Sequence, residues 1–301
     1  MNGYFKELHL ETIEIYPNTG TSHTLPWAEV TVIPIGDLQL GSQGVDIERF
    51  RRLIRWANEQ NRNGHPNVFL GMGDYIDVMS PSNREAWKAT RLYDSVRGAM
   101  EDKATELEQQ FLREVRGTEG RWIGLLHGHH YFEHADGTTS DTRIAEALQS
   151  TYLGTCAFVD LVFAHPTHHR KLYYTIWAHH GRGSGMMPHA PLNVLYRVMA
   201  HFDADCYMIG HQTKKAATPT TVLTYNHQTH RIKDRKKYLV GTGGYSLGYE
   251  QGSRNLGGRP EGTYVEQGMM SPVSLGGVLL KIRPVFGGDN TEDRLDANVE
   301  V

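Results

Sequence analysis

The stretch Leu70-Gly71-Met72-Gly73-Asp74-Tyr75-Ile76-Asp77 decides how the fold is interpreted. The apolar residues 68–70 run into a glycine-flanked turn that presents Asp74, and a second carboxylate follows at Asp77. A strand that ends in this way delivers a carboxylate to the edge of a sheet, where α/β proteins bind their ligands. Taken alone, such a turn is more often an ordinary turn with a solvated acid. The interpretation therefore depends on the side chains at other strand ends.

The composition is that of an ordinary globular protein, with 301 residues, of which 39% are hydrophobic and 22% charged. The formal net charge of -3 does not favour tight non-specific binding of nucleic acid, although a local basic groove stays open. Residues 1–7 lack the pattern of a secretory signal, and no apolar run is long enough to span a bilayer. We therefore expect no membrane association and a cytoplasmic protein, in the host cytosol if it is viral. Cys156 and Cys206 are expected to be small buried thiols.

Apolar periodicity predicts an alternation of strands and helices. Alternating residues 6–16 predict a strand and residues 17–26 a polar linker, so residues 1–27 form an N-terminal extension. A strand at 30–35, a helix capped by Asp46 and the strand before Asp74 indicate a βαβ unit. An apolar stripe predicts one long helical segment over 81–116, with the charges of residues 101–108 on a solvated face. Further strands are predicted at 122–126, 158–164, 172–178, 206–209, 221–224, 237–240 and 278–282, and further helices at 139–148 and 191–202.

Histidine is unusually frequent, with 17 residues, several of them clustered. It is the commonest transition-metal ligand, although most of the 17 are expected to be surface residues or satisfied core residues. Five predicted strand ends carry acidic, amide or imidazole side chains, namely Asp37 and Gln39, Asp74 and Asp77, His129 and His130, His179 and His180, and His211. We expect these loops to converge around a shared divalent cation.

In this order the five strand ends resemble the motifs of the calcineurin-like metallophosphoesterase superfamily, D-x-H, G-D-x-x-D, G-N-H-D/E, H and G-H-x-H. The resemblance spans roughly residues 30–213, and residues 73–77 match the second motif in full. It implies an α/β (α+β) fold, a two-layer β-sandwich flanked by helices, in a single domain at residues 28–301. It also implies a metal-dependent phosphoesterase, in which metal-activated hydroxide attacks phosphorus.

The resemblance assigns roles to five residues. It implies that Asp37 binds a first metal, that Asp74 bridges two metals, and that His180 and His211 bind the second metal. His180 is preferred to its neighbour because it directly precedes a glycine. Asp74 holds the nucleophile, and His130 contacts the phosphate and assists the leaving group.

Substrate contacts are less sharply indicated. Besides His130, Arg182 and Lys214 follow strand ends and are candidates to meet phosphate oxygens. For both cations a solvated surface position is an equal alternative. Asp77 either orients a ligand or caps a turn, and the second interpretation is slightly favoured.

Three departures from the family pattern concern the metals. Gln39 and Thr213 stand where the pattern has histidines, and both replacements weaken the first metal site. That site keeps two aspartates, with the Gln39 carbonyl as a further candidate ligand, a set suited to Mn²⁺ or Mg²⁺. His129 replaces an asparagine and adds an imidazole to the second site, which then suits Zn²⁺, Fe²⁺ or Mn²⁺. The pattern predicts one firm metal and one conditional metal.

Two functions remain open at this point. The first is hydrolysis of a phosphate ester, with a phosphodiester mildly preferred to a monoester, and nucleic acid or a nucleotide among the candidate substrates. The second is a binding module that keeps the fold but has lost the first metal, as Gln39 and Thr213 suggest. The physiological substrate, the oligomeric state and the role of the glycine-rich residues 241–262 do not follow from the sequence.

Overall fold

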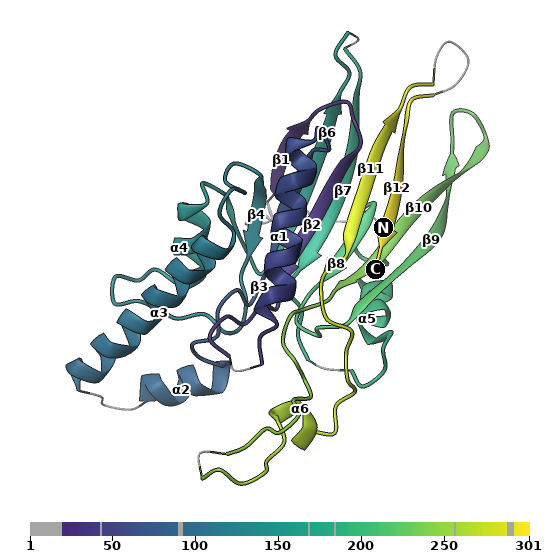
Figure 1. The fold of residues 1–301 in the computed structure, drawn as a ribbon. Helices are drawn as coiled ribbons and strands as arrows, with labels where there is room; N and C mark the ends of the chain where they lie inside the picture. The colour runs from purple at the N-terminus through teal and green to yellow at the C-terminus, as the bar shows by residue number, and fades with distance from the viewer. Residues whose placement is uncertain are drawn as a thin grey trace, which may run out of the picture.

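The computed structural model describes residues 20–42, 44–89, 93–167, 169–183, 185–255, 257–287 and 292–301. This part of the chain is a mixed α/β structure of two six-stranded sheets and six helices (Figure 1). None of the described helices is both long and apolar enough to cross a membrane. The strand predicted for residues 6–16 lies outside the described residues.

One sheet, called sheet B, contains the βαβ unit. Its strands are β2 (Val30–Gly36), β3 (Asn67–Gly73), β4 (Trp122–Leu126), β5 (Tyr152–Gly154), β11 (Leu279–Val285) and β12 (Arg294–Glu300). They lie in the order β12-β11-β2-β3-β4-β5, and β2, β3, β4 and β5 run parallel to one another. Helix α1 (Ile47–Arg62) connects β2 to β3, as predicted, and the Asp46 side chain accepts a hydrogen bond from the Arg49 amide at its start.

The other sheet, called sheet A, carries the later motifs. Its strands are β1 (Gly20–Leu25), β6 (Cys156–Ala164), β7 (Lys171–His179), β8 (Cys206–Ile209), β9 (Lys215–Asn226) and β10 (Arg231–Thr242). They lie in the order β1-β6-β7-β8-β10-β9, with β7, β8 and β10 mutually parallel. The remaining helices are α2 (Pro81–Ala89), α3 (Asp94–Glu114), α4 (Ser140–Ala147), α5 (Ala190–Val198) and the single turn α6 (Tyr264–Gln267).

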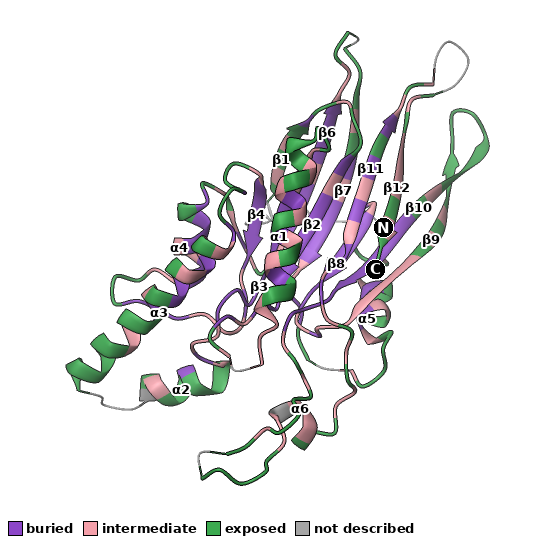
Figure 2. Ribbon diagram, in the orientation of Figure 1, coloured by how far each residue is buried: buried purple, intermediate pink, exposed green. Residues whose placement is uncertain are grey.

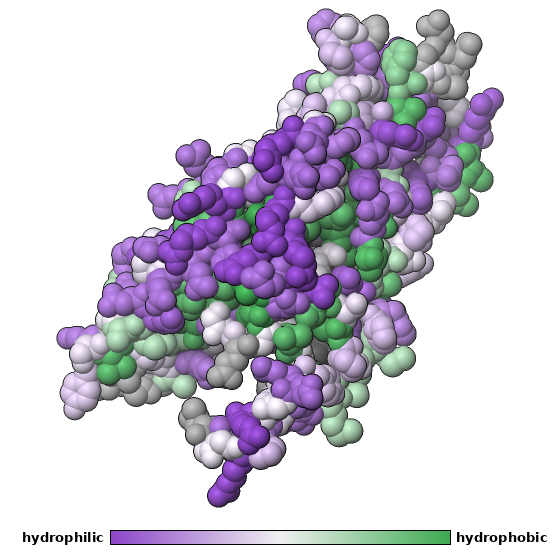
Figure 3. Space-filling model, in the orientation of Figure 1, coloured by the Kyte–Doolittle hydropathy of each residue, from purple (hydrophilic) through white to green (hydrophobic). Residues whose placement is uncertain are grey.

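The two sheets pack face to face, with helices on the outside. Leu70 and Leu280 of sheet B meet Leu161 and Met208 of sheet A in the largest core cluster. Helices α1, α3 and α4 cover the outer face of sheet B, and α5 covers the outer face of sheet A. Figure 2 shows the buried residues along the strands, and Figure 3 shows hydrophilic side chains over α1. The apolar runs therefore located most strands of both layers, although not β1, β5 or β12.

Four local predictions need correction. Residues 20–25 are not a linker, because β1 pairs with β6 at the edge of sheet A. The segment 81–116 is two helices, since Tyr93 has an extended backbone at the start of α3. Glu108 is not solvated but buried against His134, with 2.6 Å between Oε1 and Nε2. Strand β12 was not predicted, because its residues 294–300 have a weak apolar pattern.

Neither Cys156 nor Cys206 forms a disulfide with a described residue, as expected. Cys206 is fully buried on β8, and Cys156 at the start of β6 is half-buried. Burial raises the pKa of both thiols, most strongly that of Cys206.

Candidate metal centre

The candidate site lies where the carboxyl ends of strands from both sheets meet. Strands β2, β3 and β4 of sheet B and β7 and β8 of sheet A all end at this edge, and each is followed by a residue of the predicted constellation. Non-glycine residues in these turns have left-handed backbone, with φ of 48° at Asp37, 51° at Gln39, 54° at Asp74, 63° at His211 and 53° at Thr213. Such strain is held by surrounding structure and is typical of functional sites.

Asp74 is fixed at one carboxylate oxygen and open at the other. Its Oδ1 accepts hydrogen bonds from the backbone amides of His129 and His130, the second at 3.0 Å. Its Oδ2 is buried, lies 3.4 Å from Nε2 of His180 and has no hydrogen-bond partner among the described residues. The turn after β4 therefore orients Asp74 so that one oxygen faces the site.

Asp37 is held in the same manner from the opposite sheet. Its Oδ2 accepts the His211 amide at 2.8 Å, and its backbone carbonyl accepts the Tyr245 amide. The other oxygen, Oδ1, is buried and has no partner in the described part of the chain. Two buried acids thus each aim one unsatisfied oxygen into the site, which an apolar or solvated role would not require.

His180 presents its Nε2 to the same space. Its Nδ1 lies 2.7 Å from the carbonyl of Met72, a buried oxygen that can only accept, so the proton is assigned to Nδ1. In the neutral ring Nε2 carries the lone pair; it is buried, forms no hydrogen bond among the described residues and lies 3.4 Å from Asp74 Oδ2. A backbone carbonyl that fixes the tautomer in this way is a common support for metal-binding histidines.

His129 and His211 complete the set. Their Nδ1 atoms are 3.2 Å apart, and the centroid of the His129 ring lies 4.6 Å from that of His180 and 4.7 Å from that of His211. Burial lowers the pKa of both His129 and His211 to about 4. Both rings are therefore neutral at neutral pH, the form that binds a metal.

These residues form two candidate groups of metal ligands. His129, His180 and His211 make one, Asp37, Asp74 and His180 make the other, and within each group the ligand atoms lie within 4.8 Å of one another. His180 belongs to both groups. The three unpartnered atoms, Asp37 Oδ1, Asp74 Oδ2 and His180 Nε2, are those that a cation would satisfy, so the residues fit a divalent metal.

The electrostatics agree with a site arranged for positive charge. Burial raises the pKa of Asp37 to about 7, and the nearby His180 only partly opposes this effect. Burial acts in the same direction on Asp74, but His180 outweighs it and holds the pKa of Asp74 below its ordinary value. Burial lowers and the two carboxylates raise the pKa of His180, which reaches about 9. Without a metal, the His180 imidazolium balances one of the two buried carboxylates, and the other stays uncompensated unless it is protonated.

Glycines allow the loops to approach this closely. At Gly128 a methyl group would overlap the backbone nitrogen and Oδ1 of Asp74. At Gly73, which has φ of 91°, it would lie 2.6 Å from Nδ1 of His180. Only glycine at these two positions lets the carboxylate and imidazole groups share one site.

His130 faces the site without joining either ligand group. Its Nε2 lies 4.0 Å from Asp74 Oδ2, and its Nδ1 lies 2.7 Å from Asp77 Oδ1. Burial lowers the pKa of His130, but the hydrogen bond to Asp77 and the nearby carboxylates raise it above its ordinary value. Asp77 therefore orients His130, so that the favoured interpretation of Asp77 as a turn cap needs correction. The position of Asp77 three residues after Asp74 was the sequence signal that could have indicated this role.

Two buried groups hold the turn that carries His129 and His130. Arg84 of α2 donates from Nη1 to the carbonyls of His129 at 2.6 Å and Tyr131 at 3.1 Å. Asp141, at the start of α4, accepts the Gly128 amide at 2.8 Å. No local pattern indicates a role for Arg84, because its partners are backbone oxygens of a distant loop.

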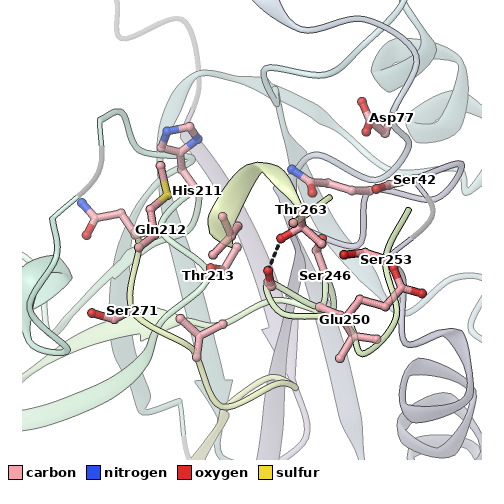
Figure 4. Close-up of a pocket in the computed structure, with 18 of the residues that line it drawn as sticks. Ser42, Asp77, His211, Gln212, Thr213, Ser246, Glu250, Ser253, Thr263 and Ser271 are labelled. Carbon is pink, nitrogen blue, oxygen red and sulfur yellow. Dashed lines mark hydrogen bonds between the residues drawn. The ribbon is translucent and has the colours of Figure 1, made fainter. Parts of the chain in front are cut away.

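A pocket of about 1070 Å³ opens beside the candidate ligand groups (Figure 4). His130, His211, Gln39, Thr213 and Lys214 are among its lining residues. The ammonium group of Lys214 donates to the carbonyl of residue 185. The opposite wall comes from the glycine-rich region of the chain, including Ser246, Glu250, Ser253 and Thr263.

The remaining candidates lie away from the ligand groups. Arg182 is exposed and is not among the described residues that line the pocket. His179 accepts the Gly181 amide at its Nδ1 and stacks on Trp177, so His180 is the histidine of this pair that reaches the site.

We also compared the chain with known proteins. A scan against protein-family models gave no match, and a search of curated proteins found no similar sequence. The relation to metallophosphoesterases therefore remains a resemblance of motifs.

Proposed function

We propose that this protein is a divalent-metal-dependent phosphoesterase. The observation that carries the proposal is the set of three buried ligand atoms, on Asp37, Asp74 and His180, which have no partner in the described part of the chain. A structural ion pair would account for Asp74 and His180, whose Oδ2 and Nε2 lie 3.4 Å apart, but it leaves Asp37 Oδ1 buried without a partner. Burying that second carboxylate oxygen without a partner costs several kcal/mol, and a bound cation removes that cost.

The residues that would hold metal fall into the two groups already described. Asp37 and Asp74 with His180 offer mainly oxygen, which suits Mn²⁺ or Mg²⁺, whereas His129 and His211 with His180 suit Zn²⁺, Fe²⁺ or Mn²⁺. When bound, such ions lower the pKa of water and neutralise charge on phosphate oxygens. Gln39 lines the neighbouring pocket and remains a candidate further ligand.

The chain's own acid for the reaction is His130. In hydrolysis a water oxygen loses a proton to solvent and forms a bond to phosphorus, the P–O bond to the leaving group breaks, and the leaving oxygen takes up a proton. The raised pKa of His130 favours the imidazolium form, whose Nδ1–H donates to Asp77 while Nε2–H faces the pocket. His130 therefore supplies the proton from Nε2, and Asp77 fixes the direction of transfer.

The binding module remains the second candidate, because Gln39 and Thr213 occupy positions where the family pattern has histidines. Both residues line the pocket beside the metal centre. They therefore give a partner polar contacts even if one metal is lost.

Hydrolysis of bis-p-nitrophenyl phosphate and p-nitrophenyl phosphate tests the proposal in Mn²⁺, Zn²⁺, Mg²⁺ or no metal. We expect metal-dependent turnover that Asp74→Asn abolishes and that His130→Ala reduces in kcat by about 100-fold or more. Asp77→Asn should reduce kcat with little change in KM, because Asp77 acts through His130. The matched control is His201→Ala, which removes an exposed histidine at the end of α5.

The absence of metal-dependent turnover with every ion and both substrates would favour the binding module. Equal rates for wild type and Asp74→Asn would point to a contaminating hydrolase. The ratio of the two substrates separates a diesterase from a monoesterase.

A further inference from the structure

The pocket beside the metal centre is larger than a phosphate group requires. Its volume of about 1070 Å³ lies at the upper end of pockets that enclose a drug-sized ligand, which run from about 300 to 1,000 Å³. His130 and His211 occupy one part of its lining, so a phosphate at the metal centre would leave most of the pocket free. The free volume is available for the organic part of a substrate.

The wall opposite the metal centre is one continuous excursion of the chain, residues 246–255 and 257–273, called the strap. It leaves and re-enters the fold at Gly244 and Gly276, whose backbones pair. The Leu247 amide donates to the carbonyl of residue 44 at 2.5 Å, and Ser271 Oγ donates to the carbonyl of Met186 at 2.8 Å. The strap thus crosses the pocket from the loop after β2 to the loop after β7.

The strap and its neighbours offer hydroxyl groups to the pocket. Ser246 on the strap and Ser42 on the loop after β2 both line it, and neither hydroxyl has a hydrogen-bond partner among the described residues (Figure 4). Gln212, more than nine-tenths buried, also lines the pocket, and its side-chain oxygen is unsatisfied there. The buried Gln212 oxygen is the atom that indicates a ligand, and the two half-buried hydroxyls can pair with hydrogen-bonding groups of that ligand.

The strap also offers an apolar surface, from Leu247, Val265, Met270 and Val273, all of which line the pocket. A ligand that pairs with hydroxyls on one side and packs against these side chains on another needs both polar groups and an apolar face.

The strap side of the pocket carries one more acid than base among its described lining residues. Glu250 and Glu261 line it, and neither carboxylate forms an ion pair within the described residues. Arg254 is the cation of the strap lining and donates to a backbone carbonyl, whereas Lys214 lies on the side of the metal centre. A chain of phosphates that continued onto the strap would meet two carboxylates and one cation, whereas an uncharged group would meet the carboxylates as hydrogen-bond acceptors.

We propose that the strap binds the organic part of a small phosphate ester, an uncharged group of about nucleoside size that carries hydroxyls and an apolar face, and that it disfavours polynucleotides. The inference rests on the proposed function and names its substrate class. It selects a small ester among the substrates that the sequence left open.

The experiment compares three probes on the full-length, metal-loaded protein: bis-p-nitrophenyl phosphate, the p-nitrophenyl ester of thymidine 5′-monophosphate, and a single-stranded oligodeoxynucleotide. In wild type we expect kcat/KM for the nucleoside ester to exceed that for the oligonucleotide by at least about tenfold. Ser246→Ala and Glu250→Gln should each lower the ratio of nucleoside-ester to bis-p-nitrophenyl phosphate kcat/KM by about three- to tenfold, the loss of one hydrogen bond. The control is Glu119→Gln, an exposed carboxylate outside the pocket lining.

An unchanged ratio in both strap variants would overturn the inference, as would an oligonucleotide hydrolysed faster than the nucleoside ester. Inactive wild type toward all three probes would instead overturn the proposed function. The strap is then tested by equilibrium binding of thymidine 5′-monophosphate. For the inference to stand, Ser246→Ala must weaken this binding about threefold or more, and Glu119→Gln must leave it unchanged.

Discussion

Replacing Asp37 by asparagine should stabilise the protein without metal and destabilise it, relative to wild type, with metal. Burial raises the pKa of Asp37 from 3.8 to about 7, which corresponds to about 4 kcal/mol of lost stability once the carboxyl group is ionised. Asparagine has no charge, and its side-chain oxygen can still accept the His211 amide. Its new NH₂ group lacks an assured partner, at a cost of about 1–3 kcal/mol. The net gain in EDTA is on the order of 1–3 kcal/mol.

The pKa of Asp37 determines how the stability difference between Asp37→Asn and wild type changes with pH. The folded-state pKa of Asp37 is raised, so ionisation costs stability, and the cost is absent below the unfolded pKa of 3.8 and complete above about 7. The melting temperature of Asp37→Asn minus that of wild type, in EDTA, should therefore rise from pH 4 to pH 8. At about 2 °C per kcal/mol the difference at pH 8 is roughly 2–6 °C.

Saturating Mn²⁺ or Zn²⁺ should reverse the order. Metal that binds only the folded protein stabilises wild type by about 2.7 kcal/mol at 100 times its Kd, and the variant gains less because it has lost a ligand. Thermal melts by circular dichroism compare the melting temperatures of the two proteins under four conditions, at pH 5 and pH 8, each with EDTA or with metal. The control is Asp234→Asn, at an exposed position of β10. The reasoning would be refuted if Asp37→Asn melted below wild type in EDTA at pH 8. It would also be refuted if metal raised the melting temperature of the variant as much as that of wild type.

Two other positions give predictions that urea unfolding can check. Gly128→Ala should destabilise the protein by about 1–3 kcal/mol and abolish metal binding in a titration, because the methyl group overlaps the loop after β3. Its control, Gly98→Ala on the exposed face of α3, should stabilise the protein by up to about 1 kcal/mol. Glu108→Ala should cost about 2 kcal/mol, since it leaves the buried His134 without its 2.6 Å partner, and Glu106→Ala on the same helix should cost less than about 0.5 kcal/mol. Equal losses within either pair would contradict the packing described here.

The elements that were predicted correctly are those whose side chains alternate or repeat on one face. The apolar runs before Asp37 and Asp74 and the stripe of α1 gave the βαβ unit, because local burial patterns are written in consecutive residues. The break between α2 and α3 and the pairing of β1 were missed. The pairing of β1 depends on β6, which is distant in the chain. The break between the helices was missed because the apolar stripe continues through Tyr93, which is exposed.

The candidate site was likewise predicted in part from local sequence, whereas the rest of it depends on tertiary contacts. The sequence by itself determined that Asp37, Asp74 and His211 each follow an apolar run and a glycine, which is a local signal. The choice of His180 over His179 came with the motif resemblance, because the glycine there follows the two histidines. Only the tertiary structure decided that Asp77 orients His130, and that the strap forms the far wall of the pocket. Those contacts form when the two sheets pack and their loops meet. The spacing of these residues in the sequence does not indicate how far apart they lie in the folded protein.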